Sequence, residues 1–358
     1  MENKINIPED AGKIITIAGT RPEIIKLSGL IPILNNKYDH ELLYTGQHYS
    51  TNMKDIFFDE LNLQPKYDLE SNTSEIRILK DNILKLLRTI KPAYVIVYGD
   101  TNSSMAGSQA AKEIGSTLIH IEAGVRDFDI AVPEEVIRLQ IDSISDYLFC
   151  PSEFCMTVLK YENIPGKTYL TGNLIVDVCK RLSELPAEKF IDVDIEGEYI
   201  LLTLHRPENC DDFQRLKMLK KHLESLRYKV IFPVHPRTMK NLNKYGINLP
   251  SNVQCIEPAS YLTFLHLLRN CKIVLTDSGG VQEESIVLKK PCITLRHTSA
   301  RWETILLKAN ILFPLDRTEP LSEYVEMMQS RNITFNPYGE NVELLTTKTI
   351  EQIISNVN

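Results

Sequence analysis

Residues 94–124 read YVIVYGDTNSSMAGSQAAKEIGSTLIHIEAG. The stretch opens with a short apolar run (94–99), continues with a helical segment (104–114) and closes with a second apolar run (117–122). Short apolar runs that alternate with helical segments are typical of a parallel sheet covered by helices on both faces. The stretch therefore predicts a strand–helix–strand unit whose strands end at Asp100 and Glu122.

The same alternation extends in both directions along the chain. The first half adds predicted strands at 13–20, 42–45, 147–150 and 169–171, and helices at 76–89 and 134–145. Pro22 begins a further helix whose apolar face continues to Leu34. A second series predicts strands at 199–204, 230–234, 253–256, 273–276, 292–295 and 311–313. The pattern predicts an α/β fold with two Rossmann-like, doubly wound domains that face a central cleft.

The length of 358 residues exceeds one typical core and fits two domains. Between the two series lies a charged, proline-bearing segment without a clear strand, so we expect the chain to cross near residues 172–195. We predict an N-terminal domain over 1–172, a C-terminal domain over 173–340, and a C-terminal helix over 341–358 that packs back on the N-terminal domain.

Composition excludes several classes of protein. The net charge is −7 and no dense Lys/Arg tract occurs, so nucleic acid is not expected as a partner. No apolar run is long enough to cross a bilayer, so no membrane partner is expected, and the polar N-terminus is unlike a signal peptide. Seven cysteines without a Cys-x-x-Cys pair indicate reduced thiols and a cytoplasmic protein.

Three acids follow predicted strand ends or begin the next helix. Taken singly, helix capping explains Asp100, and Glu134 is an acid in a first turn after a proline. Together with Glu122, they are expected at one edge of the same sheet. Carboxyl groups beside buried strand ends are partly desolvated, which suits them to proton transfer near neutral pH. The three acids therefore favour acid–base chemistry.

Two turns are candidates for holding phosphate. In TDSGGVQEE (276–284), Ser278, Gly279 and Gly280 join a strand to a helix, where backbone N–H groups and the helix dipole favour an anion. Glu284 lies one turn further, where its carboxylate could accept both ribose hydroxyls. The alternative is a Gly-Gly turn with a solvated acidic helix start. In GTRPEIIK (19–26), Arg21 and Lys26 could hold phosphate or groups near uracil, or could be solvated charges on a tight turn.

Other cofactor signals are missing from the sequence. It contains no Walker loop and no G-x-G-x-x-G fingerprint, so neither nicotinamide nor flavin is expected. No spacing of His, Cys and acids matches a metal site, so we predict no metal and no cofactor. His205 and His235 each end a predicted strand and could donate to a diphosphate, although His235 alone is explained by a loop position.

Ten motifs together carry a resemblance to the non-hydrolysing UDP-N-acetylglucosamine 2-epimerases. Between Gly19 and about Glu303 they are, in order, GTRPEIIK, TGQH, GDTNS, HIEAGVR, PEE, TGN, LTLHRPEN, VHPRT, IEP and TDSGGVQEE. The resemblance implies a GT-B-like fold and an isomerase that interconverts UDP-N-acetylglucosamine and UDP-N-acetylmannosamine. In that reaction UDP is eliminated to leave a 2-acetamidoglucal, and is then added back. It also implies a cytoplasmic homodimer that needs no cofactor and serves polysaccharide biosynthesis.

The resemblance assigns roles to individual positions. The residues matching catalytic groups are Asp100, Glu122, Glu134 and His205. Those matching contacts to UDP or sugar in the family are Arg21, Lys26, Phe264, Ser278, Gly279, Gly280, Glu284 and Arg301, so the C-terminal domain is expected to bind UDP. Gln47, His48 and His235 match positions linked to a second, regulatory substrate molecule in bacterial members.

The chain departs from the family pattern at three places. Residues 299–303 read SARWE instead of TERPE, Ile137 replaces the usual Asn, and the loop 127–132 is shorter and more acidic. These positions are expected near the sugar, so they bear on its identity. Four alternatives stay open: an epimerase of a related UDP-2-acetamido sugar, a hydrolysing epimerase that releases N-acetylmannosamine and UDP, a GT-B glycosyltransferase, and a non-catalytic nucleotide-sugar sensor.

Overall fold

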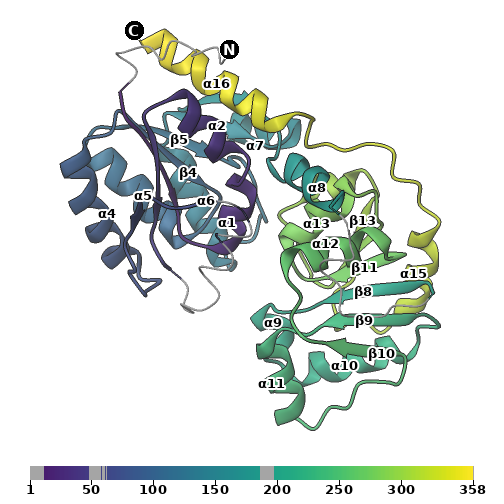
Figure 1. Cartoon of the computed structure of the whole chain (residues 1–358). Coiled ribbons are helices and arrows are strands. Elements are labelled where there is room, and N and C mark those ends of the chain that lie inside the picture. Colours follow the sequence, from purple (N-terminus) through teal and green to yellow (C-terminus); the bar gives the residue numbers. More distant parts are fainter. Residues whose placement is uncertain (1–11, 48–57, 59–60, 62, 186–196, 358) are drawn as a thin grey trace. The chain divides into compact units, whose positions relative to one another are not determined.

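The computed structural model describes residues 12–47, 58, 61, 63–185 and 197–357. The chain forms two compact units (Figure 1). Unit 1 comprises Met1–Val178 and Pro337–Asn358, and unit 2 comprises Cys179–Asn336. The boundaries that we expect between domains, after residues 172 and 340, remain predictions.

The sheet of unit 1 has seven strands in the order β3-β2-β1-β4-β5-β6-β7, and all neighbouring pairs are parallel. The strands are β1 Ile14–Ala18, β2 His40–Tyr44, β3 Tyr67–Asp68, β4 Tyr94–Tyr98, β5 Thr117–Ile121, β6 Tyr147–Cys150 and β7 Lys167–Leu170. Alternate residues face opposite sides of a strand, and β1 and β4 are buried throughout because helices cover both faces.

The helices of this unit are α1 Arg21–Leu27, α2 Leu30–Lys37, α4 Ile76–Ile90, α5 Asn102–Glu113, α6 Pro133–Ile144, α7 Glu153–Tyr161 and α16 Val342–Val357. Helices α4, α5 and α6 supply apolar side chains to a core under one face of the sheet. Helix α16 packs on α2 (Figure 1). Helix α8 (Ile175–Ser183) spans the division between the units.

The prediction of one helix from Pro22 to Leu34 is wrong. Helix α1 ends at Leu27 and α2 begins at Leu30. Pro32 has no N–H to bond the carbonyl of Ser28, so the helical ladder is interrupted at this point. Gly29 occupies the break, where an added Cβ would lie 1.6 Å from a carboxylate oxygen of Glu343 on α16. The break therefore lets α16 approach closely.

Unit 2 repeats the architecture with six parallel strands in the order β10-β9-β8-β11-β12-β13. Its strands are β8 Tyr199–Thr203, β9 Lys229–Pro233, β10 Val253–Ile256, β11 Ile273–Thr276, β12 Cys292–Thr294 and β13 Asn310–Leu312. Its helices are α9 Pro207–Cys210, α10 Phe213–Glu224, α11 Pro236–Lys244, α12 Tyr261–Asn270, α13 Gly279–Val287, α14 Trp302–Leu306 and α15 Leu321–Gln329.

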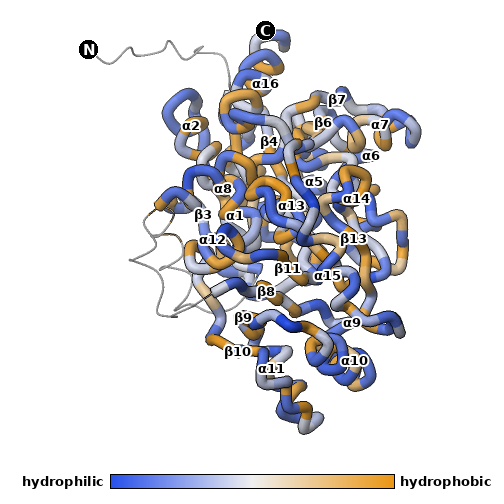
Figure 2. The backbone as a smooth tube through the Cα atoms, turned by 90° about the vertical axis from the view of Figure 1, so that its right-hand side faces the viewer, coloured by the Kyte–Doolittle hydropathy of each residue, from blue (hydrophilic) through white to orange (hydrophobic). Residues whose placement is uncertain are grey.

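The two faces of this second sheet carry separate cores. Helices α10, α11 and α15 contribute to one core, and α12 and α13 to the other. Figure 2 shows hydrophobic colour along strands such as β8 and β11, while α10 alternates between hydrophobic and hydrophilic residues as an amphipathic helix does. Among the helices of the described residues, none has the length and apolarity required to cross a bilayer. The prediction of two doubly wound α/β sheets is confirmed.

The strand order reverses once in each sheet. In unit 1 the reversal lies between β1 and β4, and in unit 2 between β8 and β11. In open parallel sheets, ligands bind outside the carboxyl ends of the strands at this reversal. The turns after these four strands are therefore where a binding site is expected, and they hold most of the motifs.

The chain returns to unit 1 at a tight contact. The N–H of Asn173 donates to the carbonyl of Tyr338 at 3.0 Å. Gly172 beside it has φ +84°, and an added Cβ would lie 2.4 Å from the same carbonyl oxygen. The N–H of Glu343, in the first turn of α16, donates to Asp177 at 2.8 Å. The close approach of two distant segments here requires a glycine.

Gly172→Ala is expected to lower the free energy of unfolding by about 2–4 kcal/mol, because positive φ costs about 1–2 kcal/mol and the clash adds to it. Gly115→Ala is the matched control, since Gly115 has φ +77° and an added Cβ there meets nothing within 4 Å. Urea unfolding followed by circular dichroism measures both. Equal losses in the two variants would contradict a role for the contact with Tyr338.

A second prediction concerns His40, which is buried between Thr16 Oγ1 at 2.7 Å and Asn35 Oδ1 at 2.5 Å. Burial lowers the pKa of His40 to about 4, against a smaller opposing effect of Glu41. Between pH 6.5 and 4 the unfolded chain therefore binds a proton here that the folded chain does not. Stability falls as the pH falls through this window, by up to about 3 kcal/mol.

The measurement is the urea midpoint of wild type and His40→Gln at several pH values between 4 and 7. The variant is expected to show a shallower fall with decreasing pH than the wild type. Parallel curves for the two proteins would show that another group causes the dependence.

Candidate active site

Glu122 directly follows β5 and is buried. One of its carboxylate oxygens lies 2.6 Å from Lys26 Nζ and accepts the hydroxyl of Tyr98, also at 2.6 Å. The Lys26 ammonium lies 5.3 Å from the centre of the Tyr98 ring. Glu122 has φ +75°, an uncommon conformation for a residue with a side chain. Lys26, predicted to hold phosphate or groups near uracil, thus lies against one of the predicted catalytic acids.

Arg138 on α6 holds Asp100, the second of the predicted acids, in place. Its Nη2 lies 2.5 Å from Asp100 Oδ2, and its Nη1 contacts Asp127 at 2.9 Å and Glu135 at 3.2 Å. Glu134 lies one helical turn before Arg138, on the same side of α6. Because Tyr98 and Ile121 are register partners, Asp100 and Glu122 follow neighbouring strand ends. The structure therefore brings Asp100, Glu122 and Glu134 to one edge of the sheet.

Glu135 has a different role from its neighbour Glu134. Its buried carboxylate accepts the N–H groups of Asp127 at 2.8 Å and Phe128 at 3.0 Å. It therefore shapes the loop before α6, in which Phe128 has φ +59°. The sequence motif PEE could not distinguish the two acids, because adjacent helical positions face different directions.

Glu23 is the most important residue that the sequence reasoning missed. One oxygen accepts the N–H groups of Gly19 and Thr20 at 2.9 and 2.7 Å, and the hydroxyl of Thr20 at 2.8 Å. The other accepts the hydroxyls of Thr101 and Ser104, both at 2.8 Å. Burial raises the pKa of Glu23, and these hydrogen bonds only partly oppose it. The capping-box spacing Thr20-x-x-Glu23 was the available signal.

The turns after β1, β2 and β4 are packed tightly on one another. An added Cβ at Gly19 would lie 1.9 Å from Ser103 Oγ and 2.5 Å from Thr45 Oγ1. Gln47 accepts both the N–H and the hydroxyl of Ser103, at 3.1 and 2.7 Å. Gln47, predicted at a regulatory position, thus contributes to the packing of these turns. Arg21 begins α1 with an exposed side chain, and His48 lies outside the described residues.

In unit 2, Asp277 organises the turn that carries His205. Its fully buried carboxylate accepts the N–H of His205 at 3.1 Å, the N–H of Arg206 at 2.9 Å and the side-chain amide of Asn209 at 3.2 Å. His205 Nδ1 lies 3.3 Å from the same carboxylate, and its side chain is 41% exposed. Since β8 and β11 are neighbours, this contact joins the two turns at the strand reversal.

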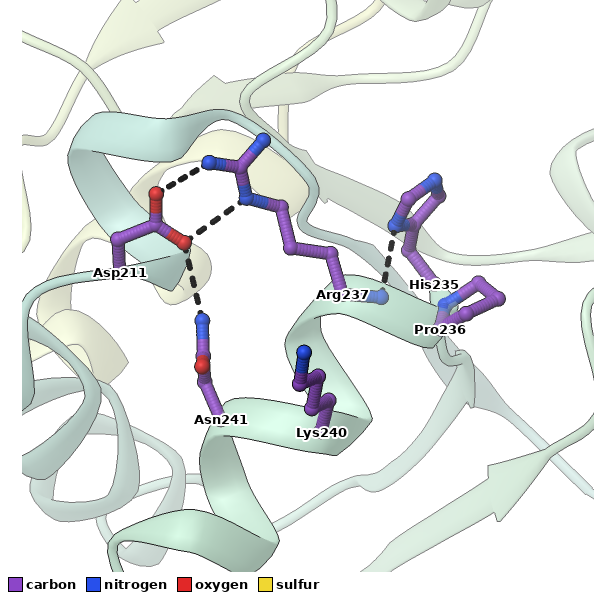
Figure 3. Close-up of a pocket in the computed structure, with 6 residues that line it drawn as sticks. All are labelled: Asp211, His235, Pro236, Arg237, Lys240 and Asn241. Atoms are coloured by element: carbon purple, nitrogen blue, oxygen red, sulfur yellow. Dashed lines mark hydrogen bonds and ion pairs between the residues drawn. The ribbon is translucent and has the colours of Figure 1, made fainter. Parts of the chain in front are cut away.

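His235 lines a hollow at the start of α11 (Figure 3). It caps the helix by accepting the N–H of Arg237 at 3.2 Å, and its ring centre lies 6.1 Å from that of His205. Burial lowers the pKa of His235, and the charges of His205 and Arg237 add to the effect. Across the hollow, Arg237 forms an ion pair with Asp211. Basic side chains thus line the hollow, but the charge of Arg237 is already paired with Asp211.

Residues 278–284 form the start of α13 as predicted. An added Cβ at Gly279 would meet nothing within 4 Å, so the first turn of the helix borders open space. Gly280 meets only Ser278 Oγ, at 3.9 Å. Glu284 is buried one turn later and accepts the hydroxyl of Tyr261 at 3.0 Å. Phe264, half-buried on α12, packs against the core beneath α13.

Arg301 is buried and lies 2.5 Å from Glu283 of α13. Its N–H donates to the Ser299 hydroxyl at 2.9 Å, and Ser299 in turn donates to Gln282 at 2.6 Å. Residues 299–303, which differ from the family pattern, therefore contact α13, the helix whose first turn is the candidate phosphate-binding site. In the described parts of the chain, no group of three or more His, Cys, Asp or Glu side chains could hold a metal ion.

The two units thus offer complementary chemistry. Unit 1 presents carboxylates next to cations, which suits proton transfer, and unit 2 presents a helix start beside a histidine, which suits an anion. Asp100 follows a strand at the reversal of unit 1, and His205 and Ser278 follow strands at the reversal of unit 2, whereas Glu122 follows β5, the next strand along. The acids Glu23, Glu135 and Asp277, which hold turns together, were not among the predicted site residues.

Known proteins resemble this chain over almost its whole length. The model of the UDP-N-acetylglucosamine 2-epimerase family matches residues 33–357. The UDP-N-acetylglucosamine 2-epimerase of Methanocaldococcus jannaschii is 43% identical, over 91% of this chain and 95% of that protein. A UDP-2,3-diacetamido-2,3-dideoxy-D-glucuronate 2-epimerase of Pseudomonas aeruginosa is 36% identical, over 84% of this chain and 88% of that protein.

The fold agrees with these relatives. The crystal structure of the M. jannaschii UDP-GlcNAc 2-epimerase in complex with UDP-GlcNAc and UDP superposes with a TM-score of 0.84 at 39% identity, covering 95% of this chain and 99% of that one. The prediction of a GT-B-like α/β fold is confirmed by this likeness. Both the match of the family model and the identity to curated relatives lead to one conclusion: this chain belongs to the UDP-N-acetylglucosamine 2-epimerase family.

Proposed function

We propose that the protein interconverts UDP-N-acetylglucosamine and UDP-N-acetylmannosamine. The observation that carries the proposal is the gathering of Asp100, Glu122 and Glu134 at one edge of a parallel sheet, where Lys26 lies against Glu122 and Arg138 against Asp100. Such an edge suits the removal and return of a weakly acidic proton. Family membership narrows the chemistry to inversion at C2 of the sugar.

The reaction we propose runs in two reversible steps. A carboxylate of unit 1 takes the proton from C2 while the bond between C1 and UDP breaks, leaving a 2-acetamidoglucal. UDP then adds back to C1 as C2 receives a proton on the opposite face. Two faces require two differently placed groups, which accounts for more than one acid.

Unit 2 is proposed to hold the UDP. The start of α13 at Ser278, Gly279 and Gly280 would receive the diphosphate, and Glu284 the ribose hydroxyls. His205 and Arg301 would stabilise the charge that develops on the leaving group, each such contact being worth about 2–4 kcal/mol in catalytic settings. Arg21 and Phe264 would contact the nucleotide. Gln47, His48 and His235 remain proposed for a second, regulatory substrate molecule.

One alternative has a specific observation in its favour. The relative from P. aeruginosa is named for a diacetamido uronate sugar, and this chain departs from the family at Ile137 and at residues 299–303. A related UDP-2-acetamido sugar is therefore the second candidate substrate. The reaction at C2 would be the same.

We further propose that the protein acts in the cytoplasm as a homodimer. All seven cysteines are free thiols, which suits a reducing compartment. The dimer is supported by the family resemblance, and light scattering on the purified protein would test it by the mass of the particle.

Deuterium exchange tests the proposed reaction directly. Incubation with UDP-N-acetylglucosamine in deuterated water is expected to give a mixture of the two epimeric UDP-sugars with deuterium at C2, because the proton is replaced from solvent during each inversion. Proton NMR measures the loss of the C2 signal. The diacetamido uronate sugar, tested in parallel, decides between the two substrates.

Other outcomes would select the rival functions. Free N-acetylmannosamine and UDP would indicate the hydrolysing epimerase. Retention of the C2 proton in every UDP-2-acetamido sugar tested would contradict the proposed function and favour a transferase or a sensor.

Glu122→Gln is expected to reduce C2 exchange by about 10²–10⁴-fold, the usual contribution of a general acid or base. UDP affinity, measured by calorimetry, should remain, because most of the proposed contacts to the nucleotide lie in unit 2 and Glu122 is not one of them. Glu113→Gln is the control, since Glu113 pairs with the surface cations Lys80 and Arg88 on α4. Unchanged turnover in Glu122→Gln would remove this residue from the mechanism.

A further inference from the structure

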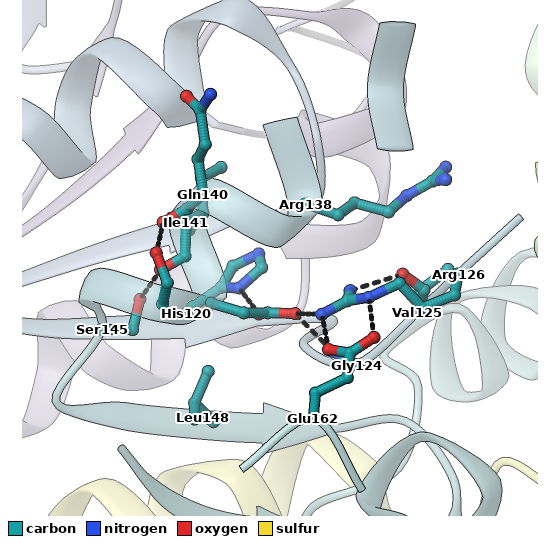
Figure 4. Close-up of polar contacts among 12 residues, drawn as sticks. His120, Gly124, Val125, Arg126, Arg138, Gln140, Ile141, Ser145, Leu148 and Glu162 are labelled. Carbon is teal, nitrogen blue, oxygen red and sulfur yellow. Dashed lines mark hydrogen bonds and ion pairs between the residues drawn. The ribbon is translucent and has the colours of Figure 1, made fainter. Parts of the chain in front are cut away.

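A buried charge network lies beneath the proposed acids, and the mechanism above makes no use of it. His120 on β5 and Asp142 on α6 are both fully buried, and His120 Nδ1 lies 2.6 Å from Asp142 Oδ1. Arg126 Nη2 lies 2.7 Å from the other oxygen of Asp142 and also 2.7 Å from Glu162 (Figure 4). A buried ion pair is costly unless its groups are fully hydrogen-bonded, so the network demands an explanation.

The second nitrogen of His120 reaches the turn that carries Asp100. His120 Nε2 lies 2.8 Å from the carbonyl oxygen of Gly99. A carbonyl oxygen can only accept, so Nε2 carries the proton and donates it. The N–H of Gly99 donates to Ile121 at 2.9 Å, and Gly99 has φ +65°. Gly99 is therefore held at both its N–H and its carbonyl oxygen, and that carbonyl belongs to the peptide unit that joins Gly99 to Asp100.

Asp142 reaches the turn that carries Glu122. Its Oδ2 accepts the N–H of Gly124 at 3.1 Å, two residues after Glu122. Gly124 has φ +80°, and an added Cβ would lie 2.5 Å from a backbone carbonyl, so this turn has little freedom. Asp142 also lies on α6, two helical turns after Glu134. One buried pair thus contacts all three elements that carry the proposed acids.

The charges that face the pair keep Asp142 available as an acceptor. Burial alone would raise the pKa of Asp142, but His120 and Arg126 hold it below its usual range. Glu162 in turn balances Arg126, and the neighbouring Cys150 keeps a neutral thiol because burial raises its pKa. The carboxylate can therefore accept from Arg126 and from the N–H of Gly124.

We propose that His120 and Asp142 are positioning residues, which set the orientation of Asp100, Glu122 and Glu134 for proton transfer without touching the substrate. The inference rests on the proposed function, since it assigns the pair to the same acids. Its main element is the hydrogen bond from His120 to Gly99, because that bond acts on the peptide next to Asp100.

Two amide variants, each of which keeps a donor at the place of one ring nitrogen, separate positioning from general stability. In His120→Gln the side-chain amide nitrogen reaches the place of Nε2 and can still donate to Gly99, whereas in His120→Asn it reaches the place of Nδ1 and can donate only to Asp142. We expect His120→Asn to lower kcat for C2 exchange by about 10²-fold, the effect of a displacement of about 1 Å, and His120→Gln to stay within about tenfold of wild type. KM and UDP affinity are expected to be unchanged in both.

Circular dichroism and urea unfolding identify a temperature at which each variant is fully folded, and kcat is compared there. Equal loss of kcat in the two variants, or a loss confined to KM, would overturn the inference while the proposed function stands. Wild-type protein without C2 exchange on any UDP-2-acetamido sugar would instead refute the proposed function. Where neither His120 variant folds, Asp142→Asn decides: kcat lowered at least about tenfold at unchanged UDP affinity supports positioning, and unchanged kcat overturns it.

Discussion

The buried carboxylate of Glu23 holds the edge of the first sheet together. It accepts two backbone N–H groups of the turn after β1, and the hydroxyls of Thr101 and Ser104 at the start of α5, which follows β4. Strands β1 and β4 are neighbours at the reversal of strand order. Removing a carboxyl group from water costs several kcal/mol unless its oxygens are satisfied, so the contacts form as a set or not at all. Asp100 immediately precedes Thr101, one of the hydroxyl donors. The placement of this proposed acid therefore depends on a carboxyl group that is not itself one of the proposed acids.

Buried carboxylates accept backbone N–H groups at other turns as well. Asp277 accepts backbone N–H groups of the turn after β8, Glu135 those of the loop before α6, and Asp142 that of Gly124. The carboxylates at these sheet edges consequently divide into two kinds. One kind binds backbone N–H groups and fixes a turn, even where it also contacts an arginine, as Glu135 and Asp142 do. The other, represented by Glu122, is held by the side chains of Lys26 and Tyr98. A side-chain ion pair can rearrange when a substrate arrives, but a carboxylate that caps a turn cannot leave without unfolding it.

The sequence predicted the strands and the turns, but it did not predict which of the two kinds each carboxylate belongs to. Apolar runs and helical segments predicted the strands of both sheets, because buried parallel strands have a strong pattern, but β3 has only two residues and no pattern to detect. The turns were predicted correctly as the places where motifs gather. Which acid at a turn caps it depends on contacts between residues far apart in sequence, such as the 81 positions that separate Glu23 from Ser104. Likewise, no sequence spacing indicates that Lys26 pairs with Glu122, because the two residues are 96 positions apart.

The proposed substrate is negatively charged, so the charge of the carboxylates near it has to be offset. A diphosphate is repelled by uncompensated acids, yet the reaction requires acids close to the sugar. In unit 1 the cations Lys26 and Arg138 lie directly against Glu122 and Asp100, so each of these two proposed acids has a compensating charge beside it. In unit 2 the first turn of α13 provides backbone donors that need no counter-ion, while Arg301 pairs with Glu283. Because backbone dipoles keep their orientation throughout a reaction, they can hold the diphosphate before and after it leaves the sugar, and they interact most strongly with the charge that develops as it leaves.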